Sequence, residues 1–168
     1  RQPMGKTTLN VGDKIPDVTL KFMGPDGLSN IRSRDLFQDK RIAVFGAIAA
    51  FGPVCSTTQL PGVVAIADQL LEKGIDGIAC IAVNDPFVMK AWGYHLGVEE
   101  KVAMISDYEG GFAEGIGVSI DLGEPFGLGQ RSKRYSMVLR EGVVEKLDVE
   151  KEILECDVSS AEKMMHWL

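Results

Sequence analysis

Hydrophobic positions along the chain fall into two patterns, and each predicts a different kind of strand. Residues 41–47 (RIAVFGA) and 75–84 (IDGIACIAVN) are nearly continuous apolar runs, which are typical of strands buried on both faces of a sheet. A shorter run at 102–106 (VAMIS) has the same character. Residues 18–22 instead alternate between apolar and polar and precede a Pro-Asp-Gly turn, and residues 134–149 form two alternating runs around an Arg-Glu-Gly turn. These alternations predict a strand with a return strand, and a hairpin.

Helical periodicity appears in residues 53–73, where the second half reads AIADQLLEK. Pro53 suits the first turn of a helix, because its missing N–H would have no intrahelical partner there. Pro61-Gly62 falls inside the segment, so the sequence predicts a kink or break at that point. Cys55 would then lie in the first helical turn, directly after the buried strand 41–47.

Three more helices are predicted from local signals. Asn84 or Asp85 is the expected N-cap of the next helix, a short helix is expected within 110–117, and a capping box formed by Ser159 and Glu162 marks the last one. Strands and helices therefore alternate before a final hairpin and helix. This order predicts an α/β fold with a central mixed β-sheet flanked by helices. No linker or repeat divides the chain, so we expect one domain over 1–168.

Composition and charge narrow the range of partners. The chain has 168 residues, 45% hydrophobic and 25% charged, as in a globular domain with a sizeable core. A net charge of −6 argues against binding to nucleic acids or anionic membranes. No apolar run approaches the ~18–20 residues of a membrane span, so we expect no nucleic acid and no membrane partner. The chain begins at Arg1, and we expect a cytoplasmic protein, or a mitochondrial or other organelle protein from which a targeting segment was removed.

The cysteines and histidines limit the kinds of metal site, disulfide and catalytic site that the chain can form. Cys55, Cys80 and Cys156 form neither a CxxC pair nor a zinc pattern, so we expect no metal and no cofactor. An odd number of cysteines also disfavours a secreted disulfide scaffold and favours free or redox-active thiols in a reducing compartment. His95 and His166 are distant from every cysteine in the sequence. We interpret both as surface residues, which leaves a Cys-His hydrolase with little support.

Each cysteine has a structural and a chemical interpretation. Cys55 either fills the strand–helix junction or is a nucleophile, because the unpaired N–H groups of a helix start favour a thiolate. Its position at the end of a buried strand, where the next helix begins, is typical of a thioredoxin-like fold. Cys80 is expected to be buried within strand 75–84. Cys156 is expected in a more accessible polar loop before the last helix.

A basic cluster of Arg131, Lys133 and Arg134 stands out in an acidic chain. It is either a solvated loop or the source of a guanidinium that reaches the Cys55 thiolate. Arg134 is the better candidate, because it opens a strand that fixes the direction of its side chain. Gly5-Lys6-Thr7 looks like the end of a phosphate-binding loop, but no strand precedes it in this chain, so we expect no phosphate site.

The segment around Cys55 resembles a known active site. VFGAIAAFGPVCSTTQLPG (44–62) is similar to the FG-x-PGAFTP-x-CS-x-x-H-x-PG pattern of the peroxiredoxins, specifically of their atypical type II (peroxiredoxin-5-like) branch. The resemblance continues in segments that cover nearly the whole chain, VGDKIPDVTL, CIAVNDPFVMKAWG, ISDYEGGFAEGIG and GQRSKRYSMVLREGVV. It implies a thioredoxin-like fold.

The resemblance also implies roles for individual residues. Cys55 matches the peroxidatic cysteine, and Arg134 matches the arginine that holds the thiolate and polarises the peroxide. Cys80 matches the resolving cysteine proposed in part of the branch, whereas Cys156 falls near a late cysteine that resolves in another part. Pro53 and the position of Gly52 belong to the segment that contacts the substrate.

Three positions depart from the pattern. Ile48 stands where the family has proline, Gly52 stands where it has threonine, and Gln59 replaces the usual histidine. The threonine hydroxyl normally contacts both the peroxide and the thiolate, and a glycine can do neither. We therefore expect the nucleophile to be intact but the orientation of the peroxide to be impaired.

Two functions of different classes follow. The first is a thiol peroxidase that reduces hydrogen peroxide and organic hydroperoxides through a sulfenic acid on Cys55. Thioredoxin, glutaredoxin or glutathione would then be the reductant, and the resemblance implies a homodimer. The alternative, favoured by Ile48 and Gly52, is a non-peroxidase redox sensor or interaction module on the same fold. The match as a whole favours the peroxidase.

Overall fold

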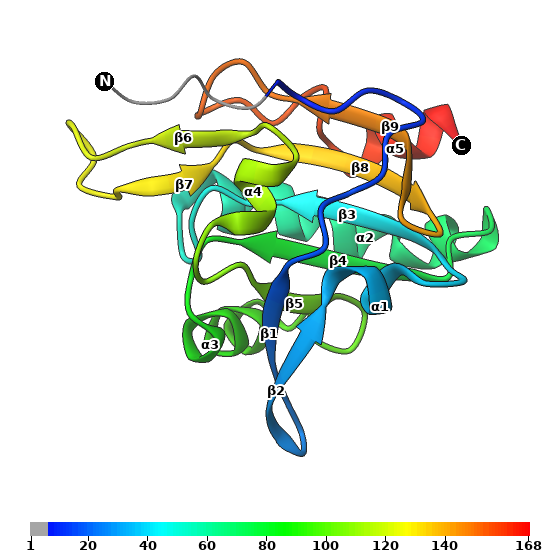
Figure 1. The fold of residues 1–168 in the computed structure, drawn as a ribbon, viewed down its shortest axis with the longest axis horizontal. Helices are drawn as coiled ribbons and strands as arrows, with labels where there is room; N and C mark the ends of the chain where they lie inside the picture. Colours follow the sequence, from blue (N-terminus) through cyan, green and yellow to red (C-terminus); the bar gives the residue numbers. More distant parts are fainter. Residues whose placement is uncertain (1–6) are drawn as a thin grey trace.

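A seven-stranded β-sheet runs through the centre of the molecule (Figure 1). In the computed structural model, which describes residues 7–168, its strands are β1 (Thr19–Gly24), β2 (Gly27–Arg32), β3 (Arg41–Gly46), β4 (Gly77–Ala82), β5 (Ala103–Ser106), β8 (Tyr135–Arg140) and β9 (Val143–Val149). Their order in the sheet is β2-β1-β5-β4-β3-β8-β9. β4 pairs in parallel with β3 and β5, whereas the other pairings are antiparallel. The prediction of a mixed sheet is confirmed.

The continuous apolar run 41–47 forms β3, between β4 and β8. Ala43 and Phe45 contribute to the core on one face of the sheet, and Ile42 and Val44 contribute to the core on the other. Successive strand residues point to opposite faces, so a strand that is covered on both sides has to be apolar throughout. The packing on both faces fixes the end of β3, and the segment that carries Cys55 begins there.

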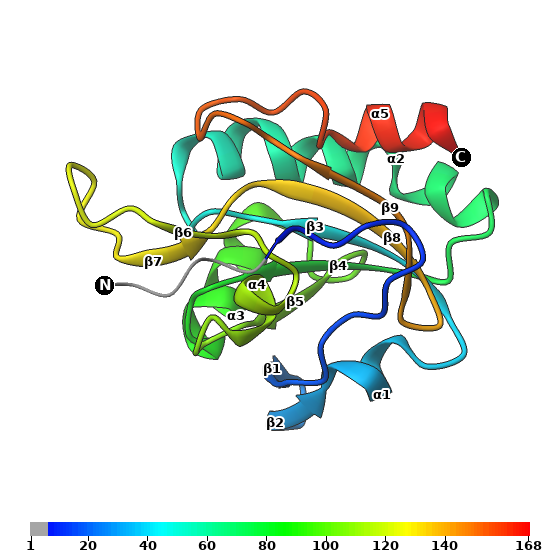
Figure 2. The same ribbon diagram turned by 45° about the horizontal axis from the view of Figure 1, so that its top comes forward.

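Helices cover both faces of the sheet, as predicted. They are α1 (Ser33–Phe37), α2 (Leu60–Glu72), α3 (Pro86–Leu96), α4 (Gly111–Gly115) and α5 (Ala161–Trp167). α2, α3 and α5 pack on the face of Phe45, and α1 and α4 pack on the opposite face. Figure 2 shows α2 and α5 next to each other on one side of β8 and β9. Asp85 is the N-cap of α3, and its carboxylate accepts a hydrogen bond from the N–H of Val88 at 2.9 Å.

The helix that carries Cys55 differs from the prediction near Pro61. Helical conformation begins at Pro53, Cys55–Gln59 form a π-helical turn, and α2 continues from Leu60 without a break. In the wide turn the N–H of Leu60 donates to the carbonyl of Cys55, five residues back. Pro61 has no N–H, and in a regular helix its ring would clash with the carbonyl four residues earlier. The predicted break at Pro61-Gly62 is therefore wrong, because the helix continues through these residues and the chain widens the turn before the proline instead.

The last helix, α5, begins one residue later than the capping-box prediction. Ser160, not Ser159, is its N-cap, and the Ser160 Oγ accepts from the N–H of Lys163 at 3.2 Å. Ser159 is fully buried, and its Oγ donates to the carboxylate of Glu150 instead. The capping-box pattern favours Ser159, because Glu162 follows it by three residues, but the distant carboxylate of Glu150 engages its hydroxyl and Ser160 becomes the cap.

A second sheet, of two strands, is absent from the sequence predictions. β6 (Ser119–Asp121) pairs with β7 (Gln130–Ser132), and the hairpin extends to one side of the main sheet in both views (Figures 1 and 2). Strands of three residues contain too few positions to show an alternating pattern. The hairpin matters for function, because Leu122, Phe126 and Leu128 between its strands reach the cavity beside Cys55.

Candidate active site

Cys55 is the third helical residue after the loop that follows β3. The first N–H groups of a helix have no intrahelical acceptor, so unpaired donors are available at this end. In the loop before it, the N–H of Ala50 donates to Asn84 Oδ1 at 2.9 Å, and Phe51 has a positive φ of 64°. Such a φ is costly for a residue other than glycine and persists only where its surroundings fix it. The loop therefore holds Cys55 in a defined and buried position, with 2% of the residue exposed.

The guanidinium of Arg134 lies directly against the Cys55 sulfur. Its Nη1 donates to Cys55 Sγ at 2.9 Å and also to Gln59 Oε1 at 2.8 Å. Nε donates to the carbonyl of Glu155, and Nη2 donates to the carbonyl of Ile153, both at 2.9 Å. The arginine itself is only 2% exposed. A buried cation at this distance attracts negative charge strongly, because charges inside this site are poorly screened by solvent.

Gln59 is a site residue for which the sequence suggested only a departure from the family pattern. Its side chain is buried, and its amide nitrogen donates to the carbonyl of Gly46 at 2.9 Å while its oxygen accepts from Arg134. Gln59 thus ties the guanidinium to the end of β3. The signal that could have found it is spacing, because residues four apart on a helix share a face and Gln59 follows Cys55 by four.

Cys55 and Arg134 line a cavity of about 130 Å³. Apart from Arg134, its lining residues are apolar and come from the loop and first turn around Cys55, the β6–β7 hairpin and the loop after β9: Ile48, Ala49, Gly52, Pro53, Val54, Leu122, Phe126, Leu128, Ile153 and Leu154. Apolar walls exclude water and so strengthen the field of the guanidinium inside the cavity. Ile48, Gly52 and Pro53, singled out in the sequence, are therefore all brought to this site.

No side-chain hydroxyl of the first helical turns is directed to the Cys55 sulfur. Ser56 Oγ accepts from Trp92 Nε1 at 3.0 Å, and Thr57 Oγ1 donates to the carbonyl of Pro53 at 2.7 Å. Thr58 is exposed, and its Oγ1 lies 3.5 Å from that of Thr57. These hydroxyls are therefore engaged elsewhere and do not replace the threonine hydroxyl that position 52 lacks.

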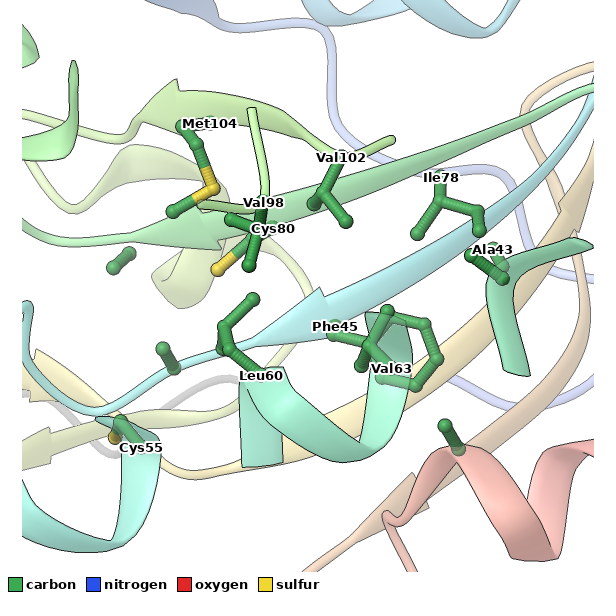
Figure 3. Close-up of a cluster of buried hydrophobic side chains, with 14 of the residues drawn as sticks. Ala43, Phe45, Cys55, Leu60, Val63, Ile78, Cys80, Val98, Val102 and Met104 are labelled. Atoms are coloured by element: carbon green, nitrogen blue, oxygen red, sulfur yellow. The ribbon is translucent and has the colours of Figure 1, made fainter. Parts of the chain in front are cut away.

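Cys80 is buried in the sheet, as expected for a residue of β4. It pairs in register with Phe45 on β3 and Met104 on β5 and is 0% exposed. Figure 3 shows its side chain inside the apolar cluster, whereas Cys55 lies at the edge of this cluster where its helix begins. Burial, reinforced by the nearby Cys55 sulfur, raises the pKa of the Cys80 thiol far above its usual range. Cys80 cannot react without opening the sheet.

Cys156 lies in the loop that also holds Arg134. It follows Glu155, whose carbonyl accepts from the guanidinium, and its side chain is only partly exposed. Burial raises the pKa of the Cys156 thiol, and the opposing charge of Arg134 does not outweigh it. Cys156 faces a separate cavity of about 640 Å³ between α2 and α5, which Gln59 also lines. Gln59 thus borders the cavity beside Cys156 and also contacts the guanidinium that lies against Cys55.

The other sequence candidates lie outside the site. Arg131 donates to the carbonyls of Leu128 and Val83 and so anchors the β6–β7 hairpin. His95 and His166 are exposed on helices, and His95 packs against the ring of Phe51. Within residues 7–168, no group of three acidic, cysteine or histidine side chains is placed to hold a metal. No helix in the same residues combines the length and the apolar character needed to cross a membrane.

Comparison with known proteins places these features in a wider context. The family model described as Redoxin matches residues 10–165. The chain is 42% identical to peroxiredoxin-2E, chloroplastic, of Arabidopsis thaliana over 85% of its own length, and it spans 62% of that relative. It is 38% identical to peroxiredoxin-2D of the same plant, with coverage of 94% of this chain and 96% of the relative. Among solved structures, reduced Prx3 of Vibrio vulnificus in complex with hydrogen peroxide is 37% identical, with a TM-score of 0.89 over 95% of this chain and 99% of the other.

Proposed function

We propose how this chain, which belongs to the peroxiredoxin family and is a thiol-dependent peroxidase, carries out its reaction: Cys55 is the nucleophile and Arg134 is its electrostatic partner. The observation that carries this assignment is the 2.9 Å contact between Arg134 Nη1 and Cys55 Sγ beside an apolar cavity. A buried cation next to a sulfur is what a nucleophilic thiolate requires, and a cysteine that only fills space requires none.

The proposed reaction begins when a hydroperoxide enters the cavity. The Cys55 thiolate attacks one oxygen of the O–O bond, so that an S–O bond forms while the O–O bond breaks. The other oxygen leaves with the bonding electron pair as alkoxide or hydroxide and takes up a proton. Arg134 and the unpaired N–H groups of the helix start stabilise the charge that develops on this leaving oxygen. Cys55 is left as a sulfenic acid.

A thiol then reduces the sulfenic acid. Its thiolate attacks the Cys55 sulfur, so that an S–S bond forms while the S–O bond breaks. The oxygen leaves as hydroxide and takes up the proton that the thiol gave up, and a second thiol releases Cys55 by disulfide exchange. We propose Cys156 as the first of these thiols, since the structure leaves it partly accessible while Cys80 is enclosed in the sheet. Thioredoxin, glutaredoxin and glutathione are the proposed external reductants, and turnover with each as sole electron donor distinguishes them.

Replacement of Cys55 tests the assignment. Cys55→Ser is nearly isosteric but has a far less acidic group, so we expect the fold to persist and peroxide turnover to fall to the uncatalysed level. Cys80→Ala is the matched control, because it removes a buried thiol of the same core cluster without touching the cavity. Stopped-flow oxidation by hydrogen peroxide measures both variants. Turnover retained in Cys55→Ser would refute the nucleophile assignment.

We also propose a homodimer that uses the rim of the cavity. Phe126 and Leu154 line the cavity and expose 50% and 70% of their surface, and Phe51, which precedes the lining residue Gly52, exposes 51%. Exposed apolar side chains grouped at one place favour association with another surface. Sedimentation velocity measures the mass in solution, and a monomer at micromolar concentration would refute the dimer.

The compartment is a separate proposal. Relatives 42% and 41% identical to this chain carry the name chloroplastic, which supports an organelle over the cytoplasm. Fluorescence microscopy of the complete protein in its own cell decides between the two.

A further inference from the structure

Glu150 is a buried acid outside the cavity for which the reaction described above has no role. It follows β9 directly and is 4% exposed. Its Oε2 accepts three hydrogen bonds, from the N–H of Asp157 at 2.8 Å, the N–H of Ser159 at 2.8 Å and the Oγ of Ser159 at 2.6 Å. The N–H of Glu150 itself donates to the carbonyl of Arg134 at 2.9 Å. One residue therefore joins both ends of the loop 151–159 to the backbone of the active-site arginine.

The loop closed by Glu150 is also the loop that holds the Arg134 side chain. The carbonyl of Ile153 accepts from Nη2, and the carbonyl of Glu155 accepts from Nε. These two acceptors fix the plane of the guanidinium, and this plane directs Nη1 to Cys55 Sγ. The side chains of residues 151–155 add little anchorage, since the loop is exposed apart from a half-buried Ile153.

We propose that Glu150 is a positioning residue for the peroxidase reaction: its carboxylate holds the loop 151–159 closed, and the loop carbonyls hold Arg134 against the Cys55 sulfur. The inference rests on the proposed roles of Cys55 and Arg134. Glu150 touches neither the sulfur nor the cavity, so it acts only through the arginine.

The chemistry of the carboxylate explains why another side chain should not replace it. A carboxylate oxygen is a strong acceptor, and hydrogen bonds to a charged acceptor are about twice as strong as neutral ones. Glutamine keeps the shape of glutamate but is a weaker acceptor, and its amide group brings two donors near backbone N–H groups that are themselves donors. The loop should then open more often, and Arg134 would lose two acceptors each time.

The test compares Glu150→Gln with wild type in the first oxidation of Cys55 by hydrogen peroxide. We expect the second-order rate constant to fall about 10- to 100-fold, as is typical when a reacting group is slightly misplaced. The pH profile of Cys55 alkylation by iodoacetamide should move to higher pH, because a less well-placed cation favours the thiolate less. Glu145→Gln is the matched control, since it removes a carboxylate from β9 that pairs with Arg41 and Arg140 instead.

A double-mutant comparison separates positioning from general loosening of the fold. In an Arg134→Lys background the guanidinium is absent, so Glu150→Gln should change the rate by less than about threefold if it acts through Arg134. Equal effects in both backgrounds would overturn the proposal. An unchanged rate and alkylation profile in Glu150→Gln would also overturn it, even if Cys156 becomes more reactive.

Two further variants keep the outcomes distinct. Should Glu150→Gln fail to fold, Ser159→Ala removes one of the three bonds and is expected to change the rate and the profile in the same direction by a smaller factor. No change in either measurement for Ser159→Ala would then refute the proposal. Failure of the underlying assignment shows itself separately, as peroxide turnover that survives Cys55→Ser.

Discussion

Introducing a hydroxyl at position 52 tests whether this site lacks a group that contacts both the Cys55 sulfur and the peroxide. A Cβ atom added to Gly52 would lie 3.6 Å from Cys55 Sγ, so the Oγ1 of a threonine, one bond further, can reach the sulfur and an incoming peroxide. Gly52 is not among the glycines with positive φ, so its backbone accepts a side chain without conformational strain. The nearest obstacle is the carbonyl oxygen of Ala49, 3.0 Å from that Cβ, which has to move by a few tenths of an ångström.

The magnitude follows from the bond that the hydroxyl would add. Removing one donor that stabilises a transition-state oxygen typically costs about 2.7–4 kcal/mol, or roughly 10²–10³ in rate. Moving the Ala49 carbonyl offsets part of this gain. We therefore expect a slow wild-type enzyme and an increase of at least about tenfold in Gly52→Thr. Replacing the glycine also reduces the conformational freedom of the unfolded chain. The free energy of unfolding should therefore change by less than about 1 kcal/mol.

Stopped-flow oxidation of Cys55 by hydrogen peroxide measures the rate, and Gly52→Val is the matched control. Valine has the shape of threonine without the hydroxyl, so it should meet the same Ala49 carbonyl and show no acceleration. A wild type that is already as fast as its threonine variant would refute the reasoning. A slow wild type that threonine fails to accelerate would instead favour a redox sensor over an efficient peroxidase.

Two other predictions concern Arg134 and Cys156. Arg134→Lys keeps the charge but loses the planar fork of the guanidinium. Stopped-flow oxidation of Cys55 should therefore slow by about tenfold or more, and the free energy of unfolding, from thermal melting, should change by less than the activation free energy does. A rate within error of wild type would remove Arg134 from the mechanism. After one equivalent of peroxide, peptide mapping should find a Cys55–Cys156 bond. Because burial raises the pKa of Cys156, its thiolate is scarce at pH 7, and the bond should form about tenfold faster per pH unit until that pKa is reached. A Cys55–Cys80 bond would reverse this order, and no bond would indicate an external thiol.

Much of the fold could be predicted because its signals are local. β3, β4 and β5 are buried on both faces and therefore read as continuous apolar runs, and the β8–β9 hairpin alternates around a turn with positive φ at Glu141 and Gly142. The placement of Cys55 followed from the same signals. Arg134 could be singled out because a residue that opens a strand has a fixed direction.

The remaining features depend on partners that are distant in the sequence. Gln59 acquires its role only because Arg134, 75 residues later, lies against it. Ser159 is drawn away from the helix cap by Glu150, and no local pattern reveals that acceptor. The π-helical turn was not predicted, for a different reason. Pro61 indicates that the helix is distorted nearby, but the same sequence is expected for a break at the proline and for a widened turn before it.

The hydrogen bonds of Arg134 have a consequence for how it meets a substrate. A guanidinium has five N–H groups, and four of them donate to Cys55, Gln59, Ile153 and Glu155. The fifth, on Nη2, is left over, and its direction is set by the other four because the group is planar. A substrate oxygen that accepts from this N–H would meet a donor that is oriented in advance, and the arginine would not have to rearrange during the reaction. An ammonium group has only three N–H groups for these four acceptors, so it has none to spare.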